Sequence, residues 1–469
     1  KIKKMKSTMS LFFGILFVSV SAALNAQIIN VPQDYPNIQI AINSAFENDT
    51  ILVAQGVYYE NINFNGKNLV LCSNYTLSGN PEDISATVIN GSTPIHADTG
   101  SCVLIVSGED STAVLQGFTI TGGTGTKWED EHNLNHWYTE GGGILIQNSS
   151  PTIKNNIITA NEAILKTSVI SSAGGGAMRC GDGNPHILNN VISYNQGLYG
   201  GGIVLNYSAA VIKNNLIFGN SGGSDFGGGG LWILFNGDLP VIIENNTIVN
   251  NHSNMGGGGV RFYYADATLV NNILWGNTAN YSEQIQGTAD VSFCCVEDGY
   301  EGEGNIEVDP EFTEVSFILT DSSPCIDAGN PDETYNDPED PMNLGYALYP
   351  SKGILTSDMG AYGGPDRIQL PSIITSVNGS GQKIKTGIIN LYPNPAANKL
   401  SISIHVETAK NVEIQIHDTR GKLLKKEMIH KQNNEPVTIH SDISMLTPGV
   451  YLISLVNNEY SDVYKFIKQ

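Results

Sequence analysis

The chain has 469 residues, 41% of them apolar, so it is long enough for two or three domains with sizeable cores. Aromatic residues at 8%, with abundant Val, Ile and Leu, exclude a disordered chain. Only 15% of the residues are charged and 51 are glycine, which argues against a helix bundle, whose exposed faces need many charges. Nine basic and 38 acidic residues between 27 and 382 give that part a net charge of −29. Such a surface repels nucleic acid and anionic lipid, so neither is an expected partner.

Residues 1–26 have the order of a secretory signal peptide. Four lysines within the first six residues precede the apolar run Leu11–Val20, and small residues lead to Ala26. The run is too short for a membrane span, and no later stretch reaches 18 apolar residues. We therefore expect export, removal of this segment, and no transmembrane segment in the mature chain.

The region that follows is predicted to begin a stack of strands. A short amphipathic helix at 36–42 is suited to capping the open end of such a stack. Strands with alternating apolar residues follow it, at 49–53, 68–72, 87–91 and 115–120.

A repeat runs through the middle of the chain. A glycine triplet followed by a short apolar strand begins each of its five copies, at 141, 174, 200, 228 and 257. Further on, each copy reads Asn-Asn-x-(Ile/Leu)-x-x-Asn, beginning at 155, 189, 214, 245 and 271. The glycines permit positive φ and close backbone approach, whereas the asparagines tolerate left-handed turns and can stack as an internal amide ladder. Such rungs share a core only when stacked, so we predict a right-handed parallel β-helix.

The order IQIAINSA…DTILVAQGVYYENINFNGKNLVL…ATVINGS…LQGFTITGG resembles the opening of the pectate-lyase-like superfamily of secreted β-helix proteins. The glycine–asparagine repeat is similar to that of its right-handed β-helix members. Together the two resemblances cover residues 27–300, and they imply a parallel β-helix with an N-terminal helical cap.

Residues 301–366 are strongly acidic and break the rhythm. The motifs VDPEF…FILTDSSPCIDAGNP…SDMGAYGGP resemble the C-terminal closing segment of many bacterial β-helix proteins. That resemblance implies a cap of the solenoid and not a separate catalytic domain. The acidic side chains have no EF-hand spacing, which favours a solvated surface over a calcium site. Residues 367–388, rich in serine and glycine, read as a flexible linker.

Residues 389–469 form a distinct module. Alternating apolar residues in KLSISI and VEIQI, with a Thr-Arg-Gly turn, predict a small antiparallel β-sandwich of immunoglobulin-like form. The entry Tyr392–Pro395 and the ending KFIKQ resemble the type A C-terminal sorting domain of the Bacteroidetes type IX secretion system. The resemblance implies that this secretion machinery is a partner, and that the protein is secreted or attached to the outer-membrane surface.

The six cysteines do not form the framework of a small disulfide-rich protein. Cys294 and Cys295 are adjacent and cannot easily pair with each other. We expect buried thiols that pack as small apolar groups, and a bridge formed in the oxidising exterior stays open as an alternative.

Strand alternation predicts which side chains of the repeats face solvent. Taking the residue one past the first apolar residue of each copy gives Leu145, Met178, Val204, Trp232 and Arg261. The next outward positions are Gln147, Cys180, Asn206, Leu234 and Tyr263. On this alignment Arg179 faces inward with Ile146 and Leu205, unless a bulge re-aims it.

Aromatic side chains on this face are candidates for sugar binding, because their rings can pack on the C–H faces of pyranoses. The candidate binding residues are Trp128, Trp137, Trp232, Tyr263 and Tyr264. The alternative is that they only pack under long loops. One such loop, 122–140, is dense in charged and aromatic residues and is either a functional loop or a lid pinned by its own tryptophans. A second insertion, 163–173, is rich in small residues.

A uronic-acid lyase is the alternative function class. β-Elimination needs Ca²⁺ or a basic side chain to neutralise the carboxylate, and a base that removes the C5 proton. Candidate calcium ligands are Glu129, Asp130 and Asp182. Candidate bases or neutralisers are Lys166, Arg179, Arg261, His132, His136 and Tyr138. The lyase signature of the family is absent, and the acidic body disfavours an anionic polymer unless calcium intervenes.

Two further enzyme classes are less favoured than a lyase. A glycoside hydrolase needs paired carboxylates, and the chain contains no Asp-Asp pair. A pectin methylesterase would need two aspartates and an arginine on neighbouring rungs, whereas Asp182, Asp225 and Arg261 are scattered. The sequence thus predicts an all-β protein, a β-helix followed by a sandwich, exported as a monomer, that binds extracellular polysaccharide or acts as a surface or adhesive protein.

Overall fold

The computed structural model describes most of the chain after the N-terminal segment. The described residues are 26–166, 170–237, 239–313, 316–371, 386–392, 396, 398–406, 411–418, 422–430, 437–447, 449–456 and 461–468. The predicted signal peptide (except Ala26) and most of the predicted linker lie outside them. Within the described ranges, no helix has both the length and the apolar character that a membrane span requires.

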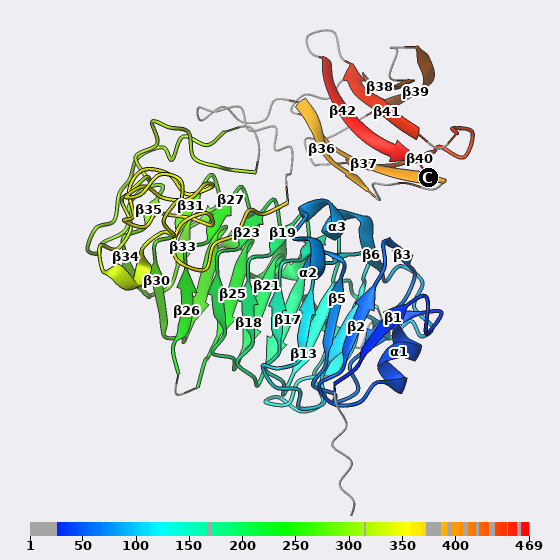
Figure 1. Ribbon diagram of the computed structural model, residues 1–469, viewed down its shortest axis with the longest axis horizontal. Coiled ribbons are helices and arrows are strands. Elements are labelled where there is room, and N and C mark those ends of the chain that lie inside the picture. The colour runs from blue at the N-terminus through cyan, green and yellow to red at the C-terminus, as the bar shows by residue number, and fades with distance from the viewer. Residues whose placement is uncertain are drawn as a thin grey trace, which may run out of the picture.

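The first part of the chain winds into a solenoid whose coils stack side by side, from the blue N-terminal end in Figure 1 to the green and yellow end. Each full coil contributes one strand to each of several parallel sheets. Sheet A contains β1 Ile28–Val31, β2 Thr50–Val53, β5 Val70–Ser73, β9 Val114–Gln116, β14 Thr152–Lys154, β18 His186–Leu188, β22 Val211–Lys213, β26 Val241–Glu244, β30 Ala267–Val270 and β34 Asp290–Ser292. Sheet B contains β3 Gly56–Tyr58, β6 Thr87–Asn90, β10 Thr119–Thr121, β15 Ile157–Thr159, β19 Val191–Ser193, β23 Leu216–Phe218, β27 Thr247–Val249, β31 Ile273–Trp275 and β35 Cys295–Val296.

Two further sheets complete the coils. Sheet C contains β4 Ile62–Asn63, β8 Val103–Ile105, β13 Ile144–Gln147, β17 Met178–Gly181, β21 Ile203–Asn206, β25 Leu231–Leu234, β29 Val260–Tyr263 and β33 Ile285–Gln286. Sheet D precedes sheet C in each coil and contains β7 Thr99–Gly100, β11 Gly125–Glu129, β12 Trp137–Glu140, β16 Ile170–Gly174, β20 Gln196–Tyr199, β24 Ser221–Gly227, β28 His252–Gly256 and β32 Thr278–Tyr281. Sheet D is parallel except at β11, which pairs antiparallel with β7 and β12. This sheet was not predicted from the sequence.

Three short α-helices lie near the N-terminal end: α1 Ile38–Ser44, α2 Tyr75–Ser78 and α3 Pro81–Ala86. The first is the predicted cap helix. Its Asn37 side chain accepts a hydrogen bond from the Ile40 amide, and its apolar face buries Ile38, Ala41 and Ile42 against the solenoid core. The helix therefore closes the open end of the stack.

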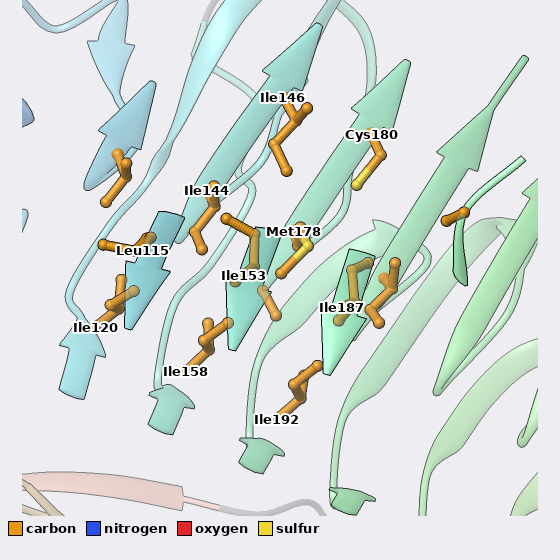
Figure 2. Close-up of a cluster of buried hydrophobic side chains, with 14 of the residues drawn as sticks. Leu115, Ile120, Ile144, Ile146, Ile153, Ile158, Met178, Cys180, Ile187 and Ile192 are labelled. Atoms are coloured by element: carbon orange, nitrogen blue, oxygen red, sulfur yellow. The ribbon is translucent and has the colours of Figure 1, made fainter. Parts of the chain in front are cut away.

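The interior of the solenoid is filled by rows of aliphatic side chains at equivalent positions of successive coils. Figure 2 shows part of these rows, including Ile146, Ile153, Ile158 and Ile187. All four are completely buried. No coil could bury these side chains alone, so the core belongs to the stack as a whole.

The second asparagine of each repeated pair forms the predicted internal ladder. In each step the amide nitrogen of one side chain donates to the amide oxygen of the next, over 3.0–3.1 Å. This ladder runs through Asn156, Asn190, Asn215, Asn246 and Asn272. A second ladder runs through Asn161, Asn195, Asn220, Asn251 and Asn277 at 3.0 Å per step. The pairs line up one above another, so the predicted stacking of coils is confirmed.

The first asparagine of each pair has a different role. It adopts positive φ at the turn between sheets A and B, as predicted, and its side chain points out of the solenoid. Asn189, Asn214 and Asn245 donate to the carbonyl oxygens of Asp366, Gly363 and Asp358. These bonds fix the acidic closing segment on the solenoid.

The closing segment, residues 306–371, runs back along the outer face of sheet B. It contains one short 3₁₀ helix, η1 Glu333–Tyr335. Its Phe317, Tyr362 and Leu370 pack on Leu216 and Phe218 of β23. The segment therefore covers the side of several coils and not only the last one.

The C-terminal module is antiparallel and all-β, as predicted. Its first sheet contains β36 Thr386–Tyr392, β37 Lys399–Val406 and β40 Val437–Asp442. Its second sheet contains β39 Leu423–His430, β38 Asn411–Asp418, β41 Gly449–Val456 and β42 Ser461–Lys468. Apolar residues from both sheets form one buried cluster, including Ile402, Ile416 and Phe466.

Candidate functional site

One row of outward side chains crosses the outer face of sheet C. The strand registers align Leu145, Arg179, Val204, Trp232, Arg261 and Gln286. We call these six residues the sheet C row. Although they point away from the solenoid core, most of them are buried, because sheet D and its connections cover this face.

The predicted alignment of the second repeat was wrong by one residue. Met178 and Cys180 pair with Ile144 and Ile146 and point into the core, as Figure 2 shows, and Arg179 points outward. The reason is Ala177, which occupies the position of the third glycine in other coils, so the strand begins one residue later after the triplet. The position of the triplet alone therefore does not determine which residues of the following strand point inward and which point outward.

The glycines of the repeat are required where the chain passes from sheet D to sheet C. A β-carbon at Gly201 would lie 2.3 Å from the carbonyl carbon of Ser221 in the next coil. At Gly176 it would lie 2.5 Å from the backbone nitrogen and oxygen of Gln196. These approaches allow sheet D to stand directly beside the sheet C row.

Arg179 is held in a buried ionic cluster beneath the hairpin β11–β12. It is only 1% exposed, and its Nε lies 2.7 Å from Oε2 of Glu140. The hydroxyl of Tyr199 donates to the other oxygen of Glu140 over 2.5 Å. Burial raises the pKa of the Glu140 carboxyl, and the neighbouring Arg179 opposes this effect. The guanidinium is thus ion-paired with Glu140 and closed off from solvent, while its Nη1 has no hydrogen-bond partner among the described residues.

The hairpin tip extends across sheet C to the turns on its far side. His132 lies 2.8 Å from Asp182 and its ring stacks on Tyr207, with 3.5 Å between the ring centroids. Within the tip, Trp128 donates to Glu131 over 2.5 Å. The predicted loop is therefore a lid pinned over the second and third repeats.

Beyond the hairpin, the sheet C row carries polar atoms that are buried without a hydrogen-bond partner among the described residues. They are Trp232 Nε1, Arg261 Nη1 and Gln286 Oε1, from three adjacent strands, and Asn206 Oδ1 lies on the neighbouring strand β21. Trp232 is 7% exposed and Asn206 8%. None of the ion pairs between described residues includes Arg261. A row of such atoms is unusual, since buried polar groups are normally satisfied.

A stack of aromatic rings borders this part of the row. Tyr207, Phe235 and Tyr264 each follow a sheet C strand directly and adopt positive φ. Their ring centroids are 5.1 and 5.6 Å apart, with interplanar angles of 29° and 11°. The inner rings are covered on both faces, whereas Tyr264 ends the stack and is 75% exposed. Tyr263 packs edge-on against it.

The comparisons with known proteins agree with the observed fold. A family described as right handed beta helix region matches residues 59–296. The chain belongs to the right-handed β-helix family. Residues 390–469 of this β-helix protein match the secretion system C-terminal sorting domain. The protein therefore carries a type IX sorting tail and is secreted or displayed at the cell surface.

Other comparisons add little to the family assignment. No curated protein with which the β-helix protein was compared matches it. A solved structure of a pectin methylesterase in complex with a hexasaccharide is similar in part, with 13% identity and a TM-score of 0.34. The similarity covers 60% of the β-helix protein and 80% of the esterase chain.

The structure brings only some of the predicted site residues together. Trp232, Arg261, Tyr263 and Tyr264 lie on or beside the part of the sheet C row beyond the hairpin. Trp128, Trp137, Tyr138, His132 and His136 lie on the hairpin, where Lys127 packs over Trp137 at 4.8 Å. Lys166 is directed elsewhere, because it donates to the carbonyl of Ala97 and to Thr124.

The predicted calcium ligands accept hydrogen bonds in the hairpin and at the adjacent end of sheet C. Glu129 accepts from the Asn135 amide, Asp130 from the His132 amide, and Asp182 from Gln147. Across the described ranges, no three His, Cys, Asp or Glu side chains are grouped so as to hold a metal ion.

Four site residues were not predicted from the sequence: Asn206, Gln286, Tyr207 and Phe235. One available signal was that the same turn position after each sheet C strand holds Asp182, Tyr207, Phe235 and Tyr264 in successive coils. Aligning that turn position would have revealed the ring stack.

Proposed function

We propose that this secreted β-helix protein binds extracellular polysaccharide along the part of the sheet C row beyond the hairpin, where Arg261 and Gln286 are partly exposed, without cleaving it. The observation that carries the proposal is the set of buried, unpartnered polar atoms on Asn206, Trp232, Arg261 and Gln286. Leaving a buried donor or acceptor unpaired costs about 1–3 kcal/mol, so a ligand that offers hydroxyl groups to these atoms recovers that free energy.

The aromatic border favours a carbohydrate over other hydroxyl-bearing ligands. Sugar sites combine apolar ring faces with a few placed polar groups. Here the exposed ring of Tyr264 and the edge-packed ring of Tyr263 lie on the strand and turn that also carry Arg261. A sugar on these rings would therefore lie within one coil of the unpartnered guanidinium.

The two arginines of the row differ in a way that bears on the ligand. Arg179 is ion-paired with Glu140, whereas Arg261 is in no ion pair between described residues; the Nη1 atoms of both lack a hydrogen-bond acceptor there. They are three strands apart, about 14 Å at the usual strand spacing, so they do not act on the same sugar ring. An acceptor-rich ligand group, such as a sugar carboxylate or vicinal hydroxyls, suits Arg261.

Binding is tested with the mature protein against immobilised neutral and uronic-acid polysaccharides, by biolayer interferometry. Trp232→Phe removes the indole N–H donor and also shortens the ring system. We expect this variant and Arg261→Ala to weaken binding about tenfold each. Matched controls are Tyr59→Ala and Lys154→Ala, which lie on other coils and faces. Equal affinity of all four variants, or no binding to any polysaccharide, would contradict the proposal.

A lyase is the second candidate, and Arg261 is the observation that favours it, since an unpaired guanidinium can neutralise a uronate. Against it, the predicted base His132 pairs with Asp182, and Lys166 donates to Ala97 and Thr124 on other coils. Incubation with uronic-acid polymers, with and without Ca²⁺, is followed by ultraviolet absorbance of unsaturated ends. We expect no increase; a steady increase that Arg261→Ala abolishes would establish the lyase instead.

A further inference from the structure

The two adjacent cysteines of the last coil point in opposite directions. Cys294 points into the solenoid and belongs to its main core, where its Sγ accepts from the Asn272 amide. Cys295, the first residue of β35, points outward and belongs to a separate cluster beneath the closing segment. Strand alternation therefore places only Cys295 in reach of a partner outside the coil.

That partner is Cys325 of the closing segment. Both thiols are completely buried in the same small cluster, with Ile273, Leu319 and Met359. Both carry free thiols in the structure; the Cys295 thiol donates to the Val308 carbonyl over 3.2 Å, and the Cys325 thiol lies close to it in the same cluster. The backbone on both sides is fixed, because the Cys295 amide donates to Asn272 over 2.8 Å and the Cys325 carbonyl accepts from Met359 over 3.0 Å.

We propose that Cys295 and Cys325 are joined by a disulfide in the exported protein, which fastens the closing segment to the last coil of the solenoid. Exported proteins meet an oxidising environment in which such bonds form and persist. The sorting tail at residues 390–469 independently indicates that this protein is secreted or displayed at the cell surface.

The oxidant is a disulfide of the thiol–disulfide exchange class, carried by a small molecule or an oxidoreductase. The thiolate of one cysteine attacks it, which gives a mixed disulfide and releases one thiol. The second cysteine then displaces the remaining half, so two protein thiols lose two electrons and two protons and the oxidant leaves as two thiols. Because both sulfurs are buried in the folded chain, the exchange precedes the final packing of the closing segment.

The other four cysteines lack such a partner in the described structure. Cys102 donates to the carbonyl of Thr121 over 3.2 Å, and Cys180 lies in the row of aliphatic core residues. Burial raises the pKa of the Cys102, Cys180 and Cys294 thiols to about 12 and also raises that of Cys325, so the pair is distinguished by the position of its two sulfurs and not by thiolate character. The proposal therefore predicts one disulfide and four free thiols.

The test uses the full chain recovered from the exterior of the producing cell without reductant. The protein is unfolded in guanidinium with excess maleimide, and the mass is measured. We expect four alkylated cysteines, and a peptide map in which residues around Cys295 and Cys325 are linked. Six alkylated cysteines, or a linkage that involves another pair, would overturn the proposal.

A second measurement tests whether the disulfide itself, and not just the two cysteine side chains, stabilises the protein. Dithiothreitol is expected to lower the melting temperature of the wild type by roughly 5 °C and to speed proteolysis of the closing segment. Cys325→Ser should melt lower and no longer respond to dithiothreitol, whereas the matched control Cys102→Ser should keep the response. A wild type that is indifferent to dithiothreitol at every concentration would count against the disulfide.

Discussion

The paired asparagines illustrate how two identical neighbours acquire different roles. The second residue of each pair points inward and joins the amide ladder, while the first points outward to the closing segment. Asn246 is central in the ladder. Its side chain donates to Asn272 and to the carbonyl of Ile212, and accepts from the amide of Asn215.

We expect Asn246→Ala to lower the free energy of unfolding by about 3 kcal/mol, because it leaves the buried Asn215 amide and the Ile212 carbonyl without partners. Denaturant unfolding followed by circular dichroism measures this change. Asn133→Ala is the matched control, since Asn133 is exposed on the hairpin tip and bonds there through its backbone. A loss below 1 kcal/mol for Asn246→Ala would mean that the ladder is not a main source of stability.

At the residue scale, the sequence predicted the ladders but not the phase of every strand. The asparagine spacing is uniform, so the inward position of its amides followed from the repeat. Ala177 replaces a glycine, and this single exchange moved Arg179 from the predicted interior to the outer face. The Arg179–Glu140–Tyr199 cluster could not be predicted, because its members come from three different strands of two sheets.

At the scale of elements, the closing segment depends on two buried carboxyl groups. Burial and the neighbouring Asp358 raise the pKa of Asp337 to about 8, and burial raises the pKa of Asp358 to about 7. Asp337 accepts from the amides of Asp358 and Gly364, which ties two turns of the segment together. The opposing positive groups are Arg367 near Asp337 and Lys352 near Asp358.

These pKa values predict that stability falls as the pH rises. A carboxyl whose pKa is raised on folding binds its proton more tightly in the native state, so its contribution is fully present below about pH 4. That contribution is lost progressively as the pH rises above 4, where the unfolded carboxyls ionise, and the loss is complete once the pH has passed 7 and 8, where the native groups ionise. We therefore expect the melting temperature to fall between pH 6 and pH 9, with increasing hydrogen exchange in the closing segment.

Asp337→Asn removes one of the two titrations and should flatten this dependence. Asp340→Asn is the matched control, because Asp340 is only half-buried on the same segment and its carboxylate accepts a local hydrogen bond from the Met342 amide. If the melting temperature of the wild type stayed level or rose from pH 6 to pH 9, the pKa values of these carboxyls would not be raised in the native protein.

The elements also mark where sequence reasoning reached its limit. Sheets A, B and C have alternating aliphatic residues, which made them predictable. Sheet D strands such as Ser221–Gly227 are rich in glycine and polar residues. They are held by pairing with the sheet D strand of the next coil. The closing segment has few regular elements, so its course along sheet B depends on contacts with Asn189, Asn214 and Asn245 that are distant in sequence.

At the scale of the whole molecule, the faces of the solenoid have different coverings. The closing segment covers the outer face of sheet B, and α1 covers the N-terminal end. The hairpin covers the first part of the sheet C row, and the rest of that row keeps unpartnered polar atoms. The proposed binding face is thus separate from the face that the closing segment covers, so the two can be altered independently.

Truncation tests this division. A chain that ends at residue 371 keeps every contact of the closing segment, and we expect it to remain folded, monomeric and able to bind polysaccharide. A chain that ends at residue 300 uncovers Leu216, Phe218 and Val249 on the outer face of sheet B, together with the unpaired edge of the last coil. Because a large exposed apolar patch beside an open strand edge promotes association, we expect it to aggregate.

Size-exclusion chromatography with light scattering distinguishes the two chains, and the polysaccharide assay is repeated on the soluble fraction of each. If the shorter chain stayed monomeric with an unchanged melting temperature, the closing segment would be dispensable for the solenoid. If the longer chain aggregated, the C-terminal module would have a structural role beyond export. The expected contrast follows from one feature, namely that Asn189, Asn214 and Asn245 point outward to bind the closing segment while their neighbours point inward to bind one another.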